Sequence, residues 1–148
     1  MSASLLDSRS FLTATPATSA FTPSRLRVWT GRAVYGLTVA LLSLDVWMKV
    51  AMTPQAVQGS AQIGFTPQHV MTIGIISLVC LAFYVIPRTR LLGAVLWTGY
   101  FGGAVVTHLR LNNPLFTHIL SGVYMGILIW GSLYLFDPRV RGMIARVR

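Results

Sequence analysis

The residues best suited to chemistry in this chain are ionisable side chains within or beside long apolar runs. Asp45 and Lys49 are four positions apart, so they share one side of a helix, and an acid four positions before a base is the favourable order for an ion pair. Ionisable groups inside apolar membrane segments cost free energy, so they usually have a partner or a function. We therefore predict a polar binding site whose candidate residues are Asp45, Lys49, His69, His108, Arg110 and His118.

Several kinds of chemistry suit these side chains. Histidine titrates near neutral pH and can move protons, and imidazole and carboxylate groups can also bind metal ions. The spacings match no metal-binding signature, so we predict no metal site. A competing interpretation is that Lys49 and Arg110 extend to lipid headgroups. In that case His69 and His118 are ordinary interfacial residues, and Asp45 only pairs with a neighbouring base.

Redox chemistry based on cysteine has little support. Cys80 is the only cysteine, so the chain cannot form an intramolecular disulfide or a CxxC pair. A free cysteine commonly behaves as a small buried apolar residue. We expect that role for Cys80.

The elements that must position these groups are long apolar segments. The chain of 148 residues is 54% hydrophobic and 10% charged, whereas soluble domains carry about 25% charged residues. A helix needs about 20 apolar residues to cross a bilayer, and four stretches approach that length. The sequence therefore predicts an all-α integral membrane four-helix bundle, with helices at about residues 30–52, 69–86, 91–109 and 116–136.

The first 28 residues differ from the rest of the chain. They are rich in Ser, Thr and Ala and contain no long apolar run, which predicts a disordered leader before a membrane domain at residues 29–148. A secretory signal peptide is not expected, because the leader has no apolar core of sufficient length. An organelle transit peptide is the alternative for this segment.

The distribution of basic residues predicts the orientation. With four spans, both termini and the turn near residue 88 share one side, and the opposite side holds only Lys49 and Arg110. The positive-inside rule then places both termini in the cytoplasm, for a multi-pass protein of the cell membrane. The net charge of +9 does not indicate nucleic-acid binding, because the basic residues form no continuous stripe. The side predicted to be cytoplasmic holds Arg9, Arg25, Arg27, Arg32, Arg88, Arg90, Arg139, Arg141, Arg146 and Arg148.

The same topology gathers the six candidate site residues at the other end of the bundle. We expect them to form a polar cup that faces the non-cytoplasmic side and holds the polar part of a small or lipid-like ligand. Trp97 and Tyr100 are candidates for its apolar wall.

Two glycine pairs predict how the third and fourth spans pack. Gly99 and Gly103, like Gly122 and Gly126, are four positions apart, and such strips let a neighbouring helix approach closely. Gly103, Gly122 and Gly126 fall near the middle of the membrane at about 1.5 Å per residue. We expect the two spans to pack against each other through these glycines. The alternative is that one strip forms a homodimer or joins another membrane partner.

The third span also carries a family resemblance. The sequences IPRTRLLGA at 86–94, TGYFGGA at 98–104 and THLR at 107–110 resemble the DoxX-like family of small bacterial membrane proteins. Weaker matches flank them at 29–32 and 137–139, so the resemblance covers about residues 28–145. It implies a four-helix bundle in the bacterial inner membrane, in a family whose members mostly have no settled activity.

The resemblance leaves the activity open. The family takes its name from proteins linked to thiosulfate:quinone oxidoreduction, so one alternative is a quinone-linked oxidoreductase component in which Asp45 and His108 handle protons. The chain has no cofactor signature of its own, and quinone enters by this analogy only. A subunit or scaffold of a membrane complex is the third possibility.

Overall fold

A computed structural model describes residues 25–146, and this part of the chain is helical throughout, with short connections and no strand. Four of its helical segments are long and apolar enough to span a membrane. They are α1 (Arg25–Val50), α3 (Pro67–Val85), α4 (Arg90–Arg110) and α5 (Leu120–Phe136), the last preceded by a π-helical turn, η2 (Leu115–Ile119). The predicted all-α, four-helix membrane architecture is confirmed.

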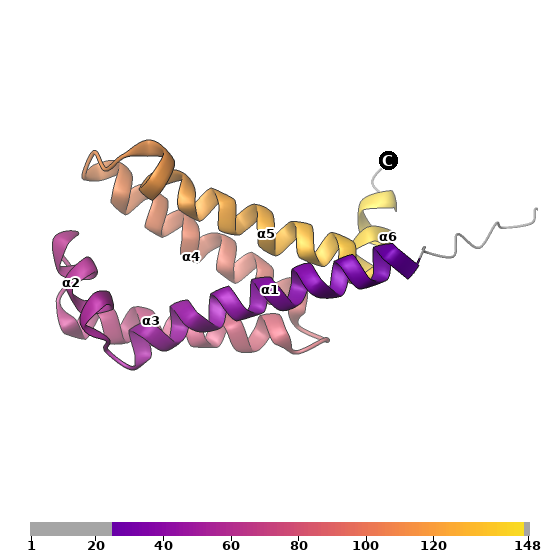
Figure 1. The fold of residues 1–148 in the computed structure, drawn as a ribbon, viewed down its shortest axis with the longest axis horizontal. Helices are drawn as coiled ribbons and strands as arrows, with labels where there is room; N and C mark the ends of the chain where they lie inside the picture. The colour runs from indigo at the N-terminus through magenta and orange to yellow at the C-terminus, as the bar shows by residue number, and fades with distance from the viewer. Residues whose placement is uncertain (1–24, 147–148) are drawn as a thin grey trace, which may run out of the picture.

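The four long helices form a closed ring. Each packs against two others, so the contacts run from α1 to α3, α3 to α4, α4 to α5 and back to α1 (Figure 1). The centre of the ring holds fully buried large side chains, including Tyr84, Trp97 and Ile129. Large apolar side chains such as Leu44, Ile75 and Ile127 face outward. An outer surface of this kind suits a lipid environment.

Two short helices differ from the prediction, which had a loop and a tail in their places. They are α2 (Pro54–Gln62) and α6 (Pro138–Arg146). Each begins with proline at its first position, where a missing N–H costs nothing. The preceding residue caps the helix: Thr53 Oγ1 accepts a hydrogen bond from Ala56 N at 3.4 Å, and Asp137 Oδ1 accepts one from Arg139 N at 2.9 Å. Both prolines therefore start a new helix, and α1 has already ended at Val50 before Pro54 is reached.

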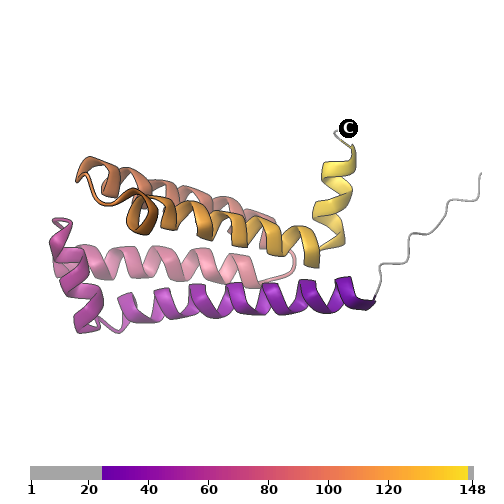
Figure 2. The ribbon, with the colours of Figure 1, turned by 45° about the horizontal axis from the view of Figure 1, so that its top comes forward.

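The short helices lie at opposite ends of the bundle. Figure 2 shows α2 across the end where α1 stops and α3 begins, and α6 turning away from the long axis beyond α5. The first helix also starts earlier than predicted, at Arg25. The last four residues of the predicted disordered leader are therefore helical, because Arg and Leu favour helix. The rest of the leader lies outside the described residues.

One glycine stands at a tight point in each of the four helix contacts. These residues are Gly31 between α1 and α5, Gly74 between α1 and α3, Gly93 between α3 and α4, and Gly122 between α4 and α5. The approach is closest at Gly93, where a methyl group would lie 2.3 Å from the backbone nitrogen of Tyr84. These helices can pack at the observed separation because the side chain is absent.

This pattern corrects the predicted glycine strips. Gly122 does approach α4, and a methyl group there would lie 2.9 Å from Val105 Cγ2. Methyl groups at Gly99, Gly103 and Gly126 would meet nothing within 4 Å. A strip of small residues shows only that close approach is possible, and the crossing point of α4 and α5 brings one of the four glycines into contact.

Candidate functional site

The six predicted site residues lie toward one end of the bundle. Successive long helices run in opposite directions, so α1 and α4 end where α3 and η2 begin (Figure 1). This end is the one that α2 crosses. The six residues do not all meet, however, and they fall into three groups.

The first group lines a cavity of about 420 Å³, which we call the cup cavity. Asp45 and Lys49 come from α1, and His108 comes from the last turn of α4. The segment that follows Lys49 also contributes, because Ser60 of α2 lines the same cavity. The remaining polar wall consists of Thr107 and Ser121, and the apolar and aromatic wall consists mainly of Ile63, Phe65, Ile73, Tyr100 and Phe101.

The ion pair predicted between Asp45 and Lys49 is present. Lys49 Nζ donates to Asp45 Oδ1, and the side chains of Lys49 and Asp45 are 20% and 35% exposed. The Lys49 ammonium also lies 5.8 Å from the centroid of the Tyr100 ring, within cation–π range. The base therefore belongs to the cavity wall instead of extending away from it.

The second carboxylate oxygen of Asp45 has a different environment. Oδ2 is buried and has no hydrogen-bond partner among the described residues. A buried acceptor without a donor costs about 1–3 kcal/mol, and more when it is charged. The Tyr100 hydroxyl interacts with the Asp45 carboxylate but makes no hydrogen bond to Oδ2. The wall of the cup cavity thus contains a strong acceptor that no described residue satisfies.

The second group is His118, which contacts His108 of the first group. Asn113 Nδ2 donates to His108 Nδ1 at 2.8 Å, which leaves Nε2 to carry the proton of the neutral ring. The His118 ring lies edge-on to it, with the centroids 5.5 Å apart. His118 itself is exposed and bonds to Thr117 Oγ1 at 2.8 Å. It borders the cavity through His108 and does not line it.

The third group lies outside the cavity. His69 Nδ1 accepts a hydrogen bond from Thr66 N at 3.2 Å and completes the cap of α3. Arg110 is exposed. Trp97, which we expected in the apolar wall, is instead completely buried in the helix core, whereas Tyr100 does line the cavity. Cys80 is buried in the core as predicted.

Within residues 25–146, no group of three or more His, Cys, Asp or Glu side chains is arranged to hold a metal ion. The cup cavity therefore offers an ion pair, an imidazole and aromatic faces. Such a set can hold the polar group of an organic molecule by hydrogen bonds and charge. It can also exchange a proton through His108 or Asp45.

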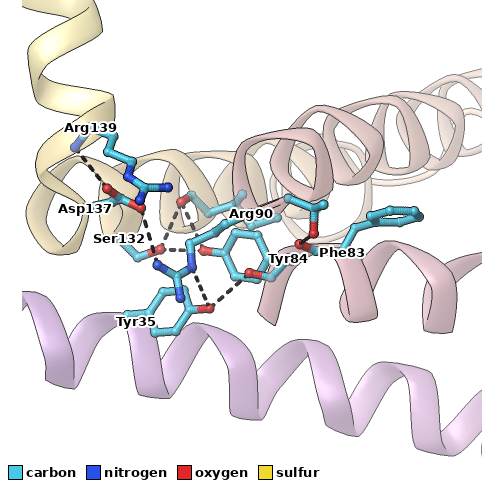
Figure 3. Close-up of polar contacts among 9 residues, drawn as sticks. Tyr35, Phe83, Tyr84, Arg90, Ser132, Asp137 and Arg139 are labelled. Atoms are coloured by element: carbon cyan, nitrogen blue, oxygen red, sulfur yellow. Dashed lines mark hydrogen bonds and ion pairs between the residues drawn. The ribbon is translucent and has the colours of Figure 1, made fainter. Parts of the chain in front are cut away.

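A second polar network, which the sequence did not reveal, lies at the opposite end of the bundle. Arg90, the first residue of α4, donates to Asp137 Oδ2 at 3.3 Å and to the hydroxyl of Tyr35 at 3.2 Å (Figure 3). The Arg90 and Asp137 side chains are each only 12% exposed. The Arg90 guanidinium lies 5.0 Å from the centroid of the Phe136 ring. The network thus joins α1, α4 and the α5–α6 junction.

Tyrosine hydroxyls extend this network into the core. Tyr35 donates to the backbone oxygen of Tyr84 at 3.0 Å, and the Tyr84 hydroxyl bonds to Ser132 Oγ at 2.7 Å (Figure 3). All four long helices are therefore linked. Arg90 and Asp137 are 47 positions apart, and no local spacing indicated that they pair. The only sequence signal was that Asp137 is one of three acids in the chain.

The family model for the DoxX-like family matches residues 33–132, which is more than half of the chain. The chain belongs to the DoxX-like family. The match contains the cup cavity residues of α1, α3, α4 and α5, and it ends before Asp137. The weaker flanking resemblances at 29–32 and 137–139 therefore lie outside it.

The other comparisons gave no match, either to curated proteins or to solved structures. This DoxX-like chain is a multi-pass membrane protein, since its four apolar helices imply a bilayer environment.

Proposed function

We propose that this DoxX-like protein binds a small or lipid-like ligand in the cup cavity. The observation that supports this most directly is the buried Asp45 Oδ2, to which no described residue donates a hydrogen bond, while its other oxygen is paired with Lys49. A ligand hydroxyl or N–H group at this oxygen would satisfy it. Concave, mostly apolar cavities with a few convergent polar groups are the usual form of ligand sites.

The residues that line the cup cavity indicate what kind of ligand it can bind. Lys49 and His108 can donate to a ligand oxygen, and Asp45 can accept from a hydroxyl. Phe65 and Phe101 supply apolar faces beside them. The ligand that fits is amphipathic, with a hydroxyl- or carbonyl-bearing polar group and an apolar ring or chain.

We predict that Asp45→Asn lowers ligand retention at least tenfold and His108→Ala several-fold, while the protein still inserts and purifies. Asp45→Asn removes a charged partner of the polar group, which is worth about 1.5–3 kcal/mol, and His108→Ala removes a neutral hydrogen-bond partner, which is worth about 0.5–1.5 kcal/mol. The measurement is mass spectrometry of organic extracts from the purified protein, normalised to the amount of protein. Arg110→Gln is the matched control, because Arg110 is at the same end but outside the cavity.

The same extracts separate the alternatives. Equal retention by the parent and both cavity variants would refute the cup site. A bound quinone would favour the oxidoreductase alternative, and reduction of that quinone, lost in His108→Ala, would establish it. Co-purification of a second membrane protein in mild detergent, with no extracted ligand, would favour a subunit or scaffold. A homodimer would show as a doubled mass in the same preparation.

We also propose that the cup cavity faces the non-cytoplasmic side. The described arginines support this, because most lie toward the opposite end of the bundle, while Lys49 and Arg110 lie near the cup. In a Cys80→Ala background, Gln58→Cys on α2 and Ala145→Cys on α6 provide exposed single thiols. We expect a membrane-impermeant maleimide to label Gln58→Cys in intact cells and Ala145→Cys only after permeabilisation. The reverse pattern would invert the topology.

A further inference from the structure

A second cavity, at the end opposite the cup, has a wall dominated by arginine. It measures about 400 Å³ and lies between the first turns of α1, the start of α4 and the α5–α6 junction. We call it the arginine pocket, after the five arginines in its wall: Arg27, Arg32, Arg90, Arg139 and Arg141. Asp137 is the acid that shares the wall.

The charges in this pocket do not balance within the described part of the chain. Both oxygens of Asp137 are already engaged, Oδ2 by Arg90 and Oδ1 by the backbone N–H of Arg139 (Figure 3). The other acid between residues 25 and 146 is Asp45, which lies near the opposite end. Arg27 has an interaction of its own and is left aside. The other four arginines of the wall still outnumber the single carboxylate among the described residues, and an anion would compensate this excess of positive charge.

Two arginines present this charge outward. The side chains of Arg32 and Arg139 come from α1 and α6 and are exposed. Arg141 uses one nitrogen, Nη1, to donate to the backbone oxygen of Leu135 at 3.0 Å, so the rest of its donor fork remains for another acceptor. Guanidinium groups bind phosphate oxygens with two parallel hydrogen bonds, which suits a phosphate in this pocket.

The position of the pocket favours a phosphate that belongs to a lipid. Val28, Leu135 and Phe136 form an apolar side of the wall. On α1 beside them, Leu26 and Trp29 are 78% and 66% exposed. Tryptophan is enriched where a membrane meets water. Figure 2 shows α6 turning away from the axis of the spanning helices here, as a helix along the membrane surface would.

We propose that the arginine pocket holds the phosphate of an anionic phospholipid, with the acyl chains along the outer surface of α1 and α5. Basic pockets between membrane helices are suited to anionic headgroups, and each basic residue near the surface adds about 1 kcal/mol of attraction. This site is separate from the cup cavity, and it stands whether or not the cup binds a ligand.

The test measures the thermal unfolding midpoint of the purified full chain in a neutral detergent. The added probes are dioctanoyl phosphatidylglycerol, dioctanoyl phosphatidylcholine, glycerol 3-phosphate and inorganic phosphate. We expect saturable stabilisation by the phosphatidylglycerol and much less by the other three. The double variant Arg32→Gln/Arg139→Gln should bind phosphatidylglycerol roughly 30-fold more weakly, because two basic residues worth about 1 kcal/mol each are lost. Arg88→Gln is the matched control, since Arg88 is exposed at the same end but does not line the pocket.

The probes distinguish the sources of the anion. Equal stabilisation by glycerol 3-phosphate or inorganic phosphate would show a free-anion site and overturn the lipid proposal. Equal stabilisation by phosphatidylcholine would show that net lipid charge is irrelevant and would also overturn it. An unchanged affinity in the double variant, or the same loss in Arg88→Gln, would place any lipid outside the pocket. Native mass spectrometry, which counts retained lipids, provides a second readout if the double variant is less stable.

Discussion

Gly93→Ala should lower the thermal unfolding midpoint of the detergent-solubilised protein by roughly 10 °C or prevent its accumulation. A methyl group at this position would lie 2.3 Å from the backbone nitrogen of Tyr84 and 2.5 Å from its Cα. Overpacking typically costs about 1–3 kcal/mol and sometimes more. The upper part of that range applies here, because the opposing atoms are backbone atoms that cannot rotate aside. Unfolding followed by fluorescence-detected size-exclusion chromatography measures the effect.

Gly99→Ala, on the same helix, is the control for that substitution. Its methyl group would meet nothing within 4 Å, and alanine is favoured over glycine inside a helix by up to about 1 kcal/mol. We therefore expect an unchanged or slightly higher midpoint. A parent-like Gly93→Ala would show that α3 and α4 do not approach as closely as the structure has them. A large loss in Gly99→Ala would instead indicate a partner on that face and revive the homodimer alternative.

Asp137→Asn should be the most destabilising charge substitution in the bundle. It leaves the Arg90 guanidinium, whose side chain is 12% exposed, without its carboxylate. Removing one partner of a buried pair costs about 3–5 kcal/mol. Asparagine can still cap α6, because its side-chain oxygen serves as well as that of aspartate at an N-cap. The loss therefore reports the ion pair, and the thermal midpoint in detergent measures it.

A double-mutant cycle makes this prediction specific. If Arg90 and Asp137 act together, the double variant Arg90→Gln/Asp137→Asn should lose less stability than the two single losses combined, by about 0.5–3 kcal/mol. Arg88→Gln, two positions before Arg90 and exposed, should have almost no effect. Strictly additive losses would mean that each residue acts through its other neighbours and that the pair itself contributes little.

The cup cavity and the arginine pocket lie at opposite ends of the helix bundle. They favour ligands that differ in charge and in hydrogen-bonding groups. The cup cavity has a carboxylate oxygen that accepts no hydrogen bond from residues 25–146, which favours a neutral or donor-bearing polar group. The arginine pocket has more guanidinium than carboxylate groups among the residues that the structure describes, which favours an anion. A lipid bound in the pocket would contact α1, which also carries Asp45 and Lys49.

The sequence alone determined the membrane bundle. Apolar runs of spanning length and a scarcity of charge leave few other solutions, because backbone groups in lipid must be satisfied within each segment. Alternating helix direction then placed Asp45, Lys49 and His108 toward one end, and the spacing of four residues predicted the ion pair of α1 correctly. These inferences rest on local patterns and on the order of the segments, both of which can be read along the chain.

Only the tertiary structure decided which residues meet across helices. The rotation and crossing of each helix selected Gly93 and Gly122 as contact points over Gly99 and Gly126. The same helix rotations place His108 in the wall of the cup cavity, whereas His69 lies outside it and caps α3. Arg90 and Asp137 are far apart in the chain, and the pairing that joins them depends on how α4 and α5 close the ring. No periodicity encodes such a contact, because it follows from packing over the whole bundle.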